Sequence, residues 1–145
     1  MDLKVEKSAY LKLKESSTKQ QISLNEVKEM IKMYIERTTK TGEQLGWEYG
    51  EAAFPYAIEE KEEGNTKYLY LKAKNEMYNY LIVGVGKEEA DGAAQDYIQI
   101  VLPDEDYRTP GDQNKAGELA KYMGKYLKAE LHLFNGRIIY NNPRK

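Results

Sequence analysis

The sequence predicts an α+β fold, in which two or three helices pack on one face of an antiparallel sheet in two layers. Most apolar segments alternate with polar residues, which is the pattern of strands with one buried face. From residue 54 onward these segments follow one another through short turns, and short turns join antiparallel neighbours. Apolar residues recur at helical spacing around residues 30 and 120. The predicted order is β-α-(α)-β-β-β-β-α-β-β.

The first part of the chain predicts a strand followed by a helix. Residues 8–14 alternate and form the strand. Ser23 and Glu26 have the spacing of a capping box, in which each side chain bonds the backbone N–H of the other residue, so the helix begins there. Its apolar spacing continues to about Lys40, and Gly42 is the predicted stop signal.

The segment TGEQLGWEYGEAAFPY, residues 41–56, is the least ordinary part of the sequence. Thr41 and Gln44 again have capping-box spacing, which predicts a short helix ended by Pro55.

An acidic aromatic cluster lies in the same segment and consists of Trp47, Glu48, Tyr49 and Glu51. Paired carboxylates beside an aromatic ring could hold a carbohydrate or another small ligand and do acid–base chemistry on it. Because no spacing identifies a catalytic pair, we favour a packed Trp47 and solvated glutamates. A ligand or hydrolytic pocket around this cluster stays open as an alternative function.

The second half of the chain predicts strands, a helix and a closing hairpin. Strands are expected at residues 55–62, 67–74, 77–86 and 96–102, with a loop at residues 87–94. The run Thr109-Pro110-Gly111-Asp112 predicts a helix start with proline at the first helical position. The apolar stripe of that helix is Ala116, Leu119, Ala120, Met123 and Leu127. Asn135-Gly136 between two apolar runs predicts the hairpin.

The register of the hairpin at residues 67–86 decides which side chains share a face. A three-residue loop, residues 75–77, pairs Leu71 with Leu81 and separates aliphatic from aromatic residues, whereas a two-residue loop mixes them. The helix-covered face then holds Leu69, Leu71, Leu81, Val83, Ile98, Ile100 and Leu102. The opposite face holds Tyr68, Tyr70, Tyr78, Tyr80 and Tyr97.

The closing hairpin extends this aromatic face. A two-residue turn pairs Leu133 with Ile138 and Leu131 with Tyr140. His132 and Phe134 then join the tyrosines if the leucines point inward. Contiguous exposed patches of this kind are typical of binding sites and interfaces.

Composition excludes several function classes. The chain has 145 residues, which predicts one domain spanning 1–145, with no cysteine and one histidine. No metal or cofactor is therefore expected from thiolate or multi-histidine sites. The formal net charge is −2, and residues 41–66 carry seven glutamates against one lysine, which disfavours nucleic acid. A charged N-terminus and the absence of long apolar runs predict a cytoplasmic protein that does not enter membranes.

Two isolated motifs carry no function by themselves. Gly84-Val85-Gly86-Lys87 ends a predicted strand, but Glu88 stands where a phosphate-binding loop requires Ser or Thr. His132 has no nucleophile motif nearby, and a lone histidine on a strand is usually structural.

Three segments carry a resemblance: residues 41–56, YIQIVLP at residues 97–103, and AELHLFNGR at residues 129–137. They resemble a family of small uncharacterised proteins from spore-forming Gram-positive bacteria, classed as a domain of unknown function. The resemblance covers nearly the whole chain and implies an α+β fold with helices on an antiparallel sheet. It implies no activity, cofactor or catalytic residue.

The sequence thus favours a non-catalytic cytosolic module that binds a protein partner or itself through the tyrosines and the segment at residues 42–56. Two other interpretations of the tyrosines remain open. In one, they cover a solvated sheet as cross-strand pairs. In the other, they stack the bases of a single-stranded nucleic acid.

Overall fold

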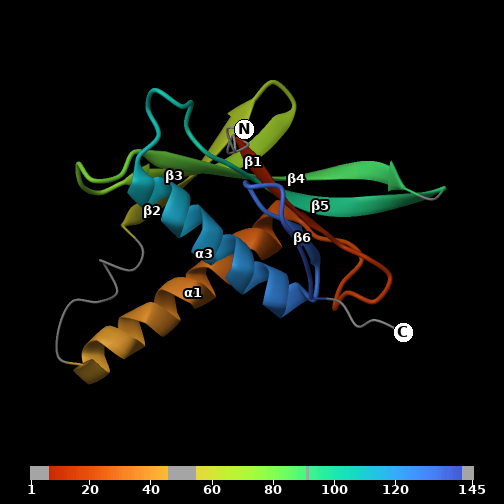
Figure 1. Ribbon diagram of the computed structural model, residues 1–145, viewed down its shortest axis with the longest axis horizontal. Coiled ribbons are helices and arrows are strands. Elements are labelled where there is room, and N and C mark those ends of the chain that lie inside the picture. Colours follow the sequence, from red (N-terminus) through yellow and green to blue (C-terminus); the bar gives the residue numbers. More distant parts are fainter. Residues whose placement is uncertain (1–6, 46–54, 91, 142–145) are drawn as a thin grey trace.

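The computed structural model describes residues 7–45, 55–90 and 92–141. In this part of the chain, seven strands form one sheet in the order β2-β3-β4-β5-β1-β6-β7, and two helices lie on the same side of it (Figure 1). All neighbouring strands are antiparallel. The predicted α+β class with an antiparallel sheet is confirmed. None of the helices in these ranges is long and apolar enough to cross a membrane.

The elements follow one another as β1 (Ser8–Lys12), α1 (Leu24–Leu45), β2 (Tyr56–Glu63), β3 (Thr66–Ala73), β4 (Tyr80–Ala90), β5 (Ala93–Val101), α3 (Pro110–Leu127), β6 (Glu130–His132) and β7 (Ile138–Tyr140). The first strand of the chain, β1, lies between β5 and β6. It therefore joins the four strands β2–β5 to the closing hairpin in one continuous sheet.

Both predicted helix starts are confirmed. The Ser23 N–H donates to Glu26 Oε1 at 3.1 Å, and the Glu26 N–H donates to Ser23 Oγ at 3.2 Å. At α3, Thr109 is the N-cap, Pro110 is the first helical residue, and Thr109 Oγ1 accepts from the Asp112 N–H at 2.9 Å. These bonds satisfy backbone N–H groups that have no partner inside the helix.

The first helix is longer than predicted. It continues to Leu45, so the stop at Gly42 and the second capping box of Thr41 and Gln44 are wrong. A single glycine costs a helix interior only about 1 kcal/mol relative to alanine. Good helix formers around it, Lys40, Gln44 and Leu45, let the backbone hydrogen bonds continue.

The register predicted for the β3–β4 hairpin is confirmed. Leu71 lies opposite Leu81, and Leu69 lies opposite Val83. The helix-facing residues expected from this register are all completely buried: Leu69, Leu71, Leu81, Val83, Ile98, Ile100 and Leu102. The predicted stripe of α3 is completely buried as well: Ala116, Leu119, Ala120, Met123 and Leu127.

The loop expected at residues 87–94 is wrong. Strands β4 and β5 stay paired as far as Ala90 and Ala93, and they form an arm that extends past the rest of the sheet (Figure 1). Gly92 has a φ of 78°, a left-handed conformation that glycine adopts without strain. Asp-Gly at residues 91–92 is a hairpin signal in the sequence, and it outweighs the polar composition of the flanking residues.

The closing hairpin is displaced by one residue from its predicted register. Leu131 pairs with Ile139 instead of Tyr140, and the Leu133 N–H donates to the Arg137 carbonyl at 2.8 Å. Gly136 has a φ of 85°, so the connection is a three-residue loop with glycine in its left-handed position. The Asn-Gly signal is therefore correct, but the turn type is not the two-residue one.

Asp112 joins α3 to the sheet. Its side chain is fully buried, and Oδ1 accepts a hydrogen bond from the Tyr56 hydroxyl at 2.5 Å. The Asn79 N–H donates to both carboxylate oxygens at 3.0 Å. Burial raises the pKa of the Tyr56 hydroxyl above its ordinary value, and the hydrogen bond to Asp112 raises this pKa further. One carboxylate thus holds α3, β2 and the segment before β4.

We expect Asp112→Ala to lower the free energy of unfolding by about 3 kcal/mol or more, because it removes a helix cap and a buried acceptor together. Tyr56→Phe removes one donor and should cost about 1 kcal/mol. Asp106→Ala is the control, since Asp106 is exposed, and should stay within about 0.5 kcal/mol of the wild type. Urea unfolding followed by circular dichroism measures all three. A loss below about 1 kcal/mol for Asp112→Ala would contradict this role.

The Tyr56 hydroxyl also predicts a difference at alkaline pH. Its pKa is raised in the folded protein, so its contribution to stability is complete below the unfolded value near 10 and is lost as pH rises above it. The stability gap between wild type and Tyr56→Phe should be constant from about pH 7 to 9 and narrow above about pH 10. Urea unfolding of both proteins across this range is the measurement. A gap that widens at high pH is the opposite of what this hydrogen bond requires.

Candidate functional site

The sheet face that points away from the helices is the candidate site, and we call it the tyrosine face. Alternation along the strands gives it five half-buried tyrosines: Tyr10, Tyr68, Tyr70, Tyr80 and Tyr97. Tyr140, which is 47% exposed, belongs to it at the β7 edge. Both described helices pack against the other face (Figure 1).

The structure places most of the predicted aromatic residues on this face, but not all of them. Tyr68, Tyr70, Tyr80 and Tyr97 lie there as expected. His132 also lies there, opposite Tyr10.

Tyr78 and Phe134 were predicted for the tyrosine face and lie on the helix side. Strand β4 begins at Tyr80, so the alternation does not extend back to Tyr78. The Tyr78 ring packs 5.7 Å from that of Tyr56, against Gly111 of α3. Phe134 follows β6 in the three-residue loop and is only 5% exposed. Both corrections have one cause, since a side chain outside a strand does not follow the pleat.

Tyr10 is the residue that the sequence interpretation missed. Leu11 and Leu13 are buried, so alternation alone puts Tyr10 on the opposite face. Because β1 lies between β5 and β6, Tyr10 lies in the interior of that face and not at its edge.

The second candidate cluster, Trp47, Glu48, Tyr49 and Glu51, lies outside the described residues. So does the part of the predicted short helix from residue 46 to residue 54.

Neighbouring tyrosines hold one another in place. The rings of Tyr10 and Tyr97 meet edge to face with centroids 5.6 Å apart, and those of Tyr70 and Tyr80 stack at 5.4 Å. The Lys61 ammonium lies 5.8 Å from the centre of the Tyr70 ring. Such pairs contribute roughly 0.5–1.5 kcal/mol beyond burial, so the rings are preorganised on the sheet.

Two glycines of β4 interrupt the aromatic surface. The Tyr97 ring lies across Gly86, where an added Cβ would clash with Tyr97 Cζ. Gly84 is different, because an added Cβ there would have no atom within 4 Å. The tyrosine face therefore has one filled and one bare glycine position.

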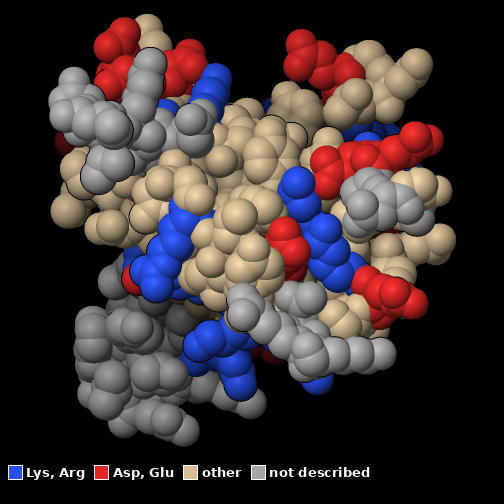
Figure 2. Space-filling view, turned by 45° about the vertical axis from the view of Figure 1, so that its right-hand side comes forward, with Lys and Arg blue, Asp and Glu red and all other residues tan. Residues whose placement is uncertain are grey.

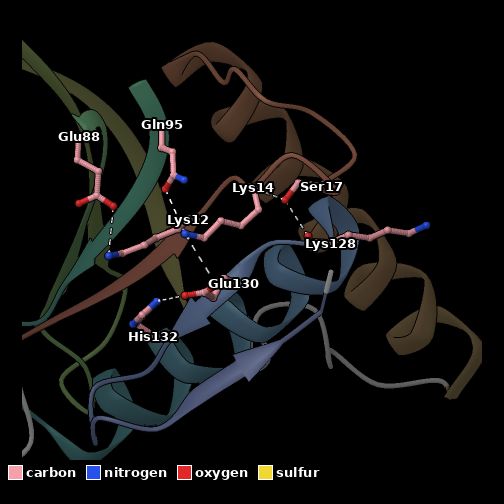
Figure 3. A network of polar contacts seen from close by, with 8 residues as sticks. All are labelled: Lys12, Lys14, Ser17, Glu88, Gln95, Lys128, Glu130 and His132. Carbon is pink, nitrogen blue, oxygen red and sulfur yellow. Dashed lines mark hydrogen bonds and ion pairs between the residues drawn. The ribbon is translucent and has the colours of Figure 1, made fainter. Parts of the chain in front are cut away.

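A polar network closes one end of the face (Figure 3). Lys12 Nζ lies 3.2 Å from Glu88 Oε1, and Lys14 Nζ lies 3.2 Å from Gln95 Oε1 and 3.9 Å from Glu130 Oε2. His132 Nε2 lies 2.9 Å from Glu130 Oε1.

This network balances charge and offers no metal site. Two lysines face two glutamates, so their formal charges cancel at that end of the face. In the residues that the structure describes, no group of three His, Asp or Glu side chains could hold a metal ion. On the side of the molecule drawn in Figure 2, acidic and basic side chains are also interspersed around an uncharged area.

The chemistry of the tyrosine face suits a protein surface better than a nucleic acid. Lys61 Nζ lies 3.1 Å from Glu59 Oε1, so Lys12, Lys14 and Lys61 each have a glutamate beside them on the same face. A phosphate backbone would have to compete with these pairs, whereas a neutral aromatic surface matches the composition of protein interfaces.

The two glycines predict opposite responses to the same substitution. Gly86→Ala should destabilise the fold by about 1 kcal/mol, because the new methyl group displaces Tyr97 from the strand and from Tyr10. Gly84→Ala should be neutral or stabilise by up to about 1 kcal/mol, because its Cβ meets nothing and the unfolded chain loses entropy. Thermal and urea unfolding of the matched pair measure the difference. Equal effects of the two substitutions on stability would contradict this prediction, because they would show that the Tyr97 ring tolerates a methyl group at residue 86.

Comparison with known proteins agrees with the resemblance in the sequence. The profile of a domain of unknown function, DUF1885, matches residues 7–143. A crystal structure of a protein of unknown function from Bacillus stearothermophilus, a spore-former, is similar with a TM-score of 0.54 and 36% sequence identity, over 85% of this chain and 91% of that one. No functionally curated protein matches significantly. The chain therefore belongs to the DUF1885 family of domains of unknown function.

Proposed function

We propose that this protein is a non-catalytic interaction module whose tyrosine face binds a protein surface, and that the surface is a second copy of the chain. The observation that carries the proposal is the set of half-buried tyrosine rings held in pairs on one sheet face. The proposal includes the two-layer arrangement, in which the helices cover one face and leave the other to the partner. Cytoplasmic residence stays a prediction of the sequence.

The size of the face supports an interface. Seven strands about 4.8 Å apart, with about seven residues each on average at about 3.3 Å, cover a plane on the order of 700 Å². Side-chain relief raises the accessible area above that value. A standard interface buries roughly 800 Å² on each partner, which is the same scale.

The fixed positions of the rings support a role in binding, rather than a role as a cover of the solvated sheet. Tyrosine loses little conformational entropy on binding and offers both an apolar ring and a hydroxyl. Rings already fixed by their neighbours, as Tyr70 is by Tyr80, lose still less.

The charges of the face support self-association. Lysines and glutamates of the face already stand in pairs, as Lys61 does with Glu59. Two copies can therefore meet without a large field of one sign, and their charged groups can interleave.

The alternatives make different predictions for the same surface. Single-stranded nucleic acid would bind the tyrosines of a monomer and be released by salt. A solvated face would bind neither. The pocket around Trp47, Glu48 and Glu51 lies outside the described residues and stays a prediction.

Sedimentation equilibrium over a concentration series tests the proposal. We expect a dimer at micromolar concentration, and we expect Tyr97→Lys to raise the dissociation constant by tenfold or more, because it places a charge inside a desolvated interface. Tyr107→Lys is the matched control, since Tyr107 is 66% exposed and lies in the loop before α3 rather than on a strand of the tyrosine face.

Circular dichroism must show that both variants keep the fold. A wild type that stays monomeric up to about 100 μM would contradict the proposal. So would a dimer that Tyr107→Lys weakens as much as Tyr97→Lys does. Binding of a single-stranded oligonucleotide by the monomer at low salt would favour the nucleic-acid alternative instead.

A further inference from the structure

Gly84 is a glycine that the folded chain itself does not require. It lies inside β4, paired with Gln99 of β5 and one residue past Val83, where the pairing of β4 with β3 ends. Its φ is not positive, unlike that of Gly64, Gly92 and Gly136, and an added Cβ would meet nothing within 4 Å. A glycine inside a strand costs stability, and it often marks a place where another group approaches the backbone closely.

Gly86, two residues further along β4, shows how such a space can be filled. Gly86 lies on the same face, and the ring of Tyr97 from the same chain fills the space above it. No described residue of the chain fills the corresponding space above Gly84. A ring from another molecule could occupy it in the same way.

The cross-strand pairing names a candidate for that ring. Gln99 of β5 lies opposite Gly84 on one side and opposite Tyr10 on the other. The bare glycine and the central tyrosine are therefore in one row of the sheet, one strand to either side of β5.

We propose that two copies of the chain pack tyrosine face to tyrosine face about a two-fold axis that runs along β5 over Gln99, with Tyr10 of each copy seated on Gly84 of the other. This proposal rests on the proposed function and adds its contact residues. Rotation about an axis along β5 exchanges the strands on either side, so β1 of one copy lies over β4 of the other. Gly84 and Tyr10, which share a row, then face each other twice.

The spacing of packed sheets explains why this position has no side chain. Two face-to-face sheets lie about 10 Å apart. Within its own chain the Tyr10 hydroxyl accepts a hydrogen bond from Gln99 Nε2 at 3.3 Å, so the ring must turn away from Gln99 to cross the gap. A tyrosine turned in this way fills most of the gap, so the residue opposite it must be small. Aligned packing of this kind also keeps the strand directions of the two sheets within about 30°, as their twist requires.

Charge supports the same arrangement. On the tyrosine face β1 and the residues after it carry Lys12 and Lys14, whereas β4 carries Glu88. An axis along β5 brings the lysines of one copy over Glu88 of the other. The existing pair of Lys12 and Glu88 in each chain would become half of an alternating cluster of four charges.

Gly84→Val tests the proposed contact between Tyr10 and Gly84 directly. The Cβ of the new side chain meets no atom of the chain within 4 Å, and valine suits a strand, so the variant should unfold at the temperature of the wild type or above it. It should also raise the dissociation constant of the dimer by tenfold or more, measured by sedimentation equilibrium. Gly117→Ala adds a methyl group on α3, where an added Cβ also meets nothing, and should leave the dissociation constant unchanged.

A second experiment tests the axis and does not depend on Gly84. Because the chain has no cysteine, Gln99→Cys creates a single thiol that lies beside its own copy only if the axis passes there. A short bismaleimide should join Gln99→Cys into a covalent dimer. It should not join Lys72→Cys, a control in β3 on the same face, two strands from β5.

The outcomes separate this inference from the proposed function. If the wild type is a monomer, both the proposed function and this inference are wrong. If Tyr97→Lys breaks the dimer but Gly84→Val leaves its dissociation constant within about threefold of the wild type, only the proposed contact between Tyr10 and Gly84 is wrong. If Lys72→Cys cross-links and Gln99→Cys does not, the axis along β5 is wrong.

Discussion

The fold depends on one buried carboxylate. Asp112 caps α3, accepts from the Tyr56 hydroxyl of β2, and accepts from the Asn79 N–H just before β4. Each of these groups would otherwise be buried or half-buried without its acceptor, at a cost of about 1–3 kcal/mol each. The carboxylate therefore fixes where α3 begins relative to the sheet. Tyr78, next to Asn79, lies before β4 and packs against Tyr56 on the helix side.

Placement of the helices on one side decides what the other side can do. The aliphatic side chains at the centre of the sheet, among them Leu69, Ile100 and Leu131, are completely buried under them. The opposite face carries tyrosine rings and paired charges. In an apolar core their hydroxyls and ions would be left without hydrogen-bond partners. The two glycines of β4 then give that face its shape, because one is covered by Tyr97 and the other is bare.

Much of this could be predicted from local patterns. Ser23 with Glu26 and Thr109 with Asp112 predicted both helix starts, because caps depend only on residues three apart. The β3–β4 register followed from separating leucines from tyrosines on the two faces. The errors arose where two local signals compete. Gly42 did not end α1, Asp-Gly at residues 91–92 extended a hairpin into a predicted loop, and Gly136 selected a longer turn than Asn-Gly suggests.

By itself the sequence determined the fold class, the helix starts and the division of β3, β4 and β5 into an aliphatic and an aromatic side. These depend on the period of the side chains and on contacts within a few residues. Tertiary structure alone decided that β1 lies between β5 and β6, and hence that Tyr10 and Gly84 flank Gln99 in one row. That arrangement joins residues almost ninety positions apart, and no periodicity in the chain records which distant strands become neighbours.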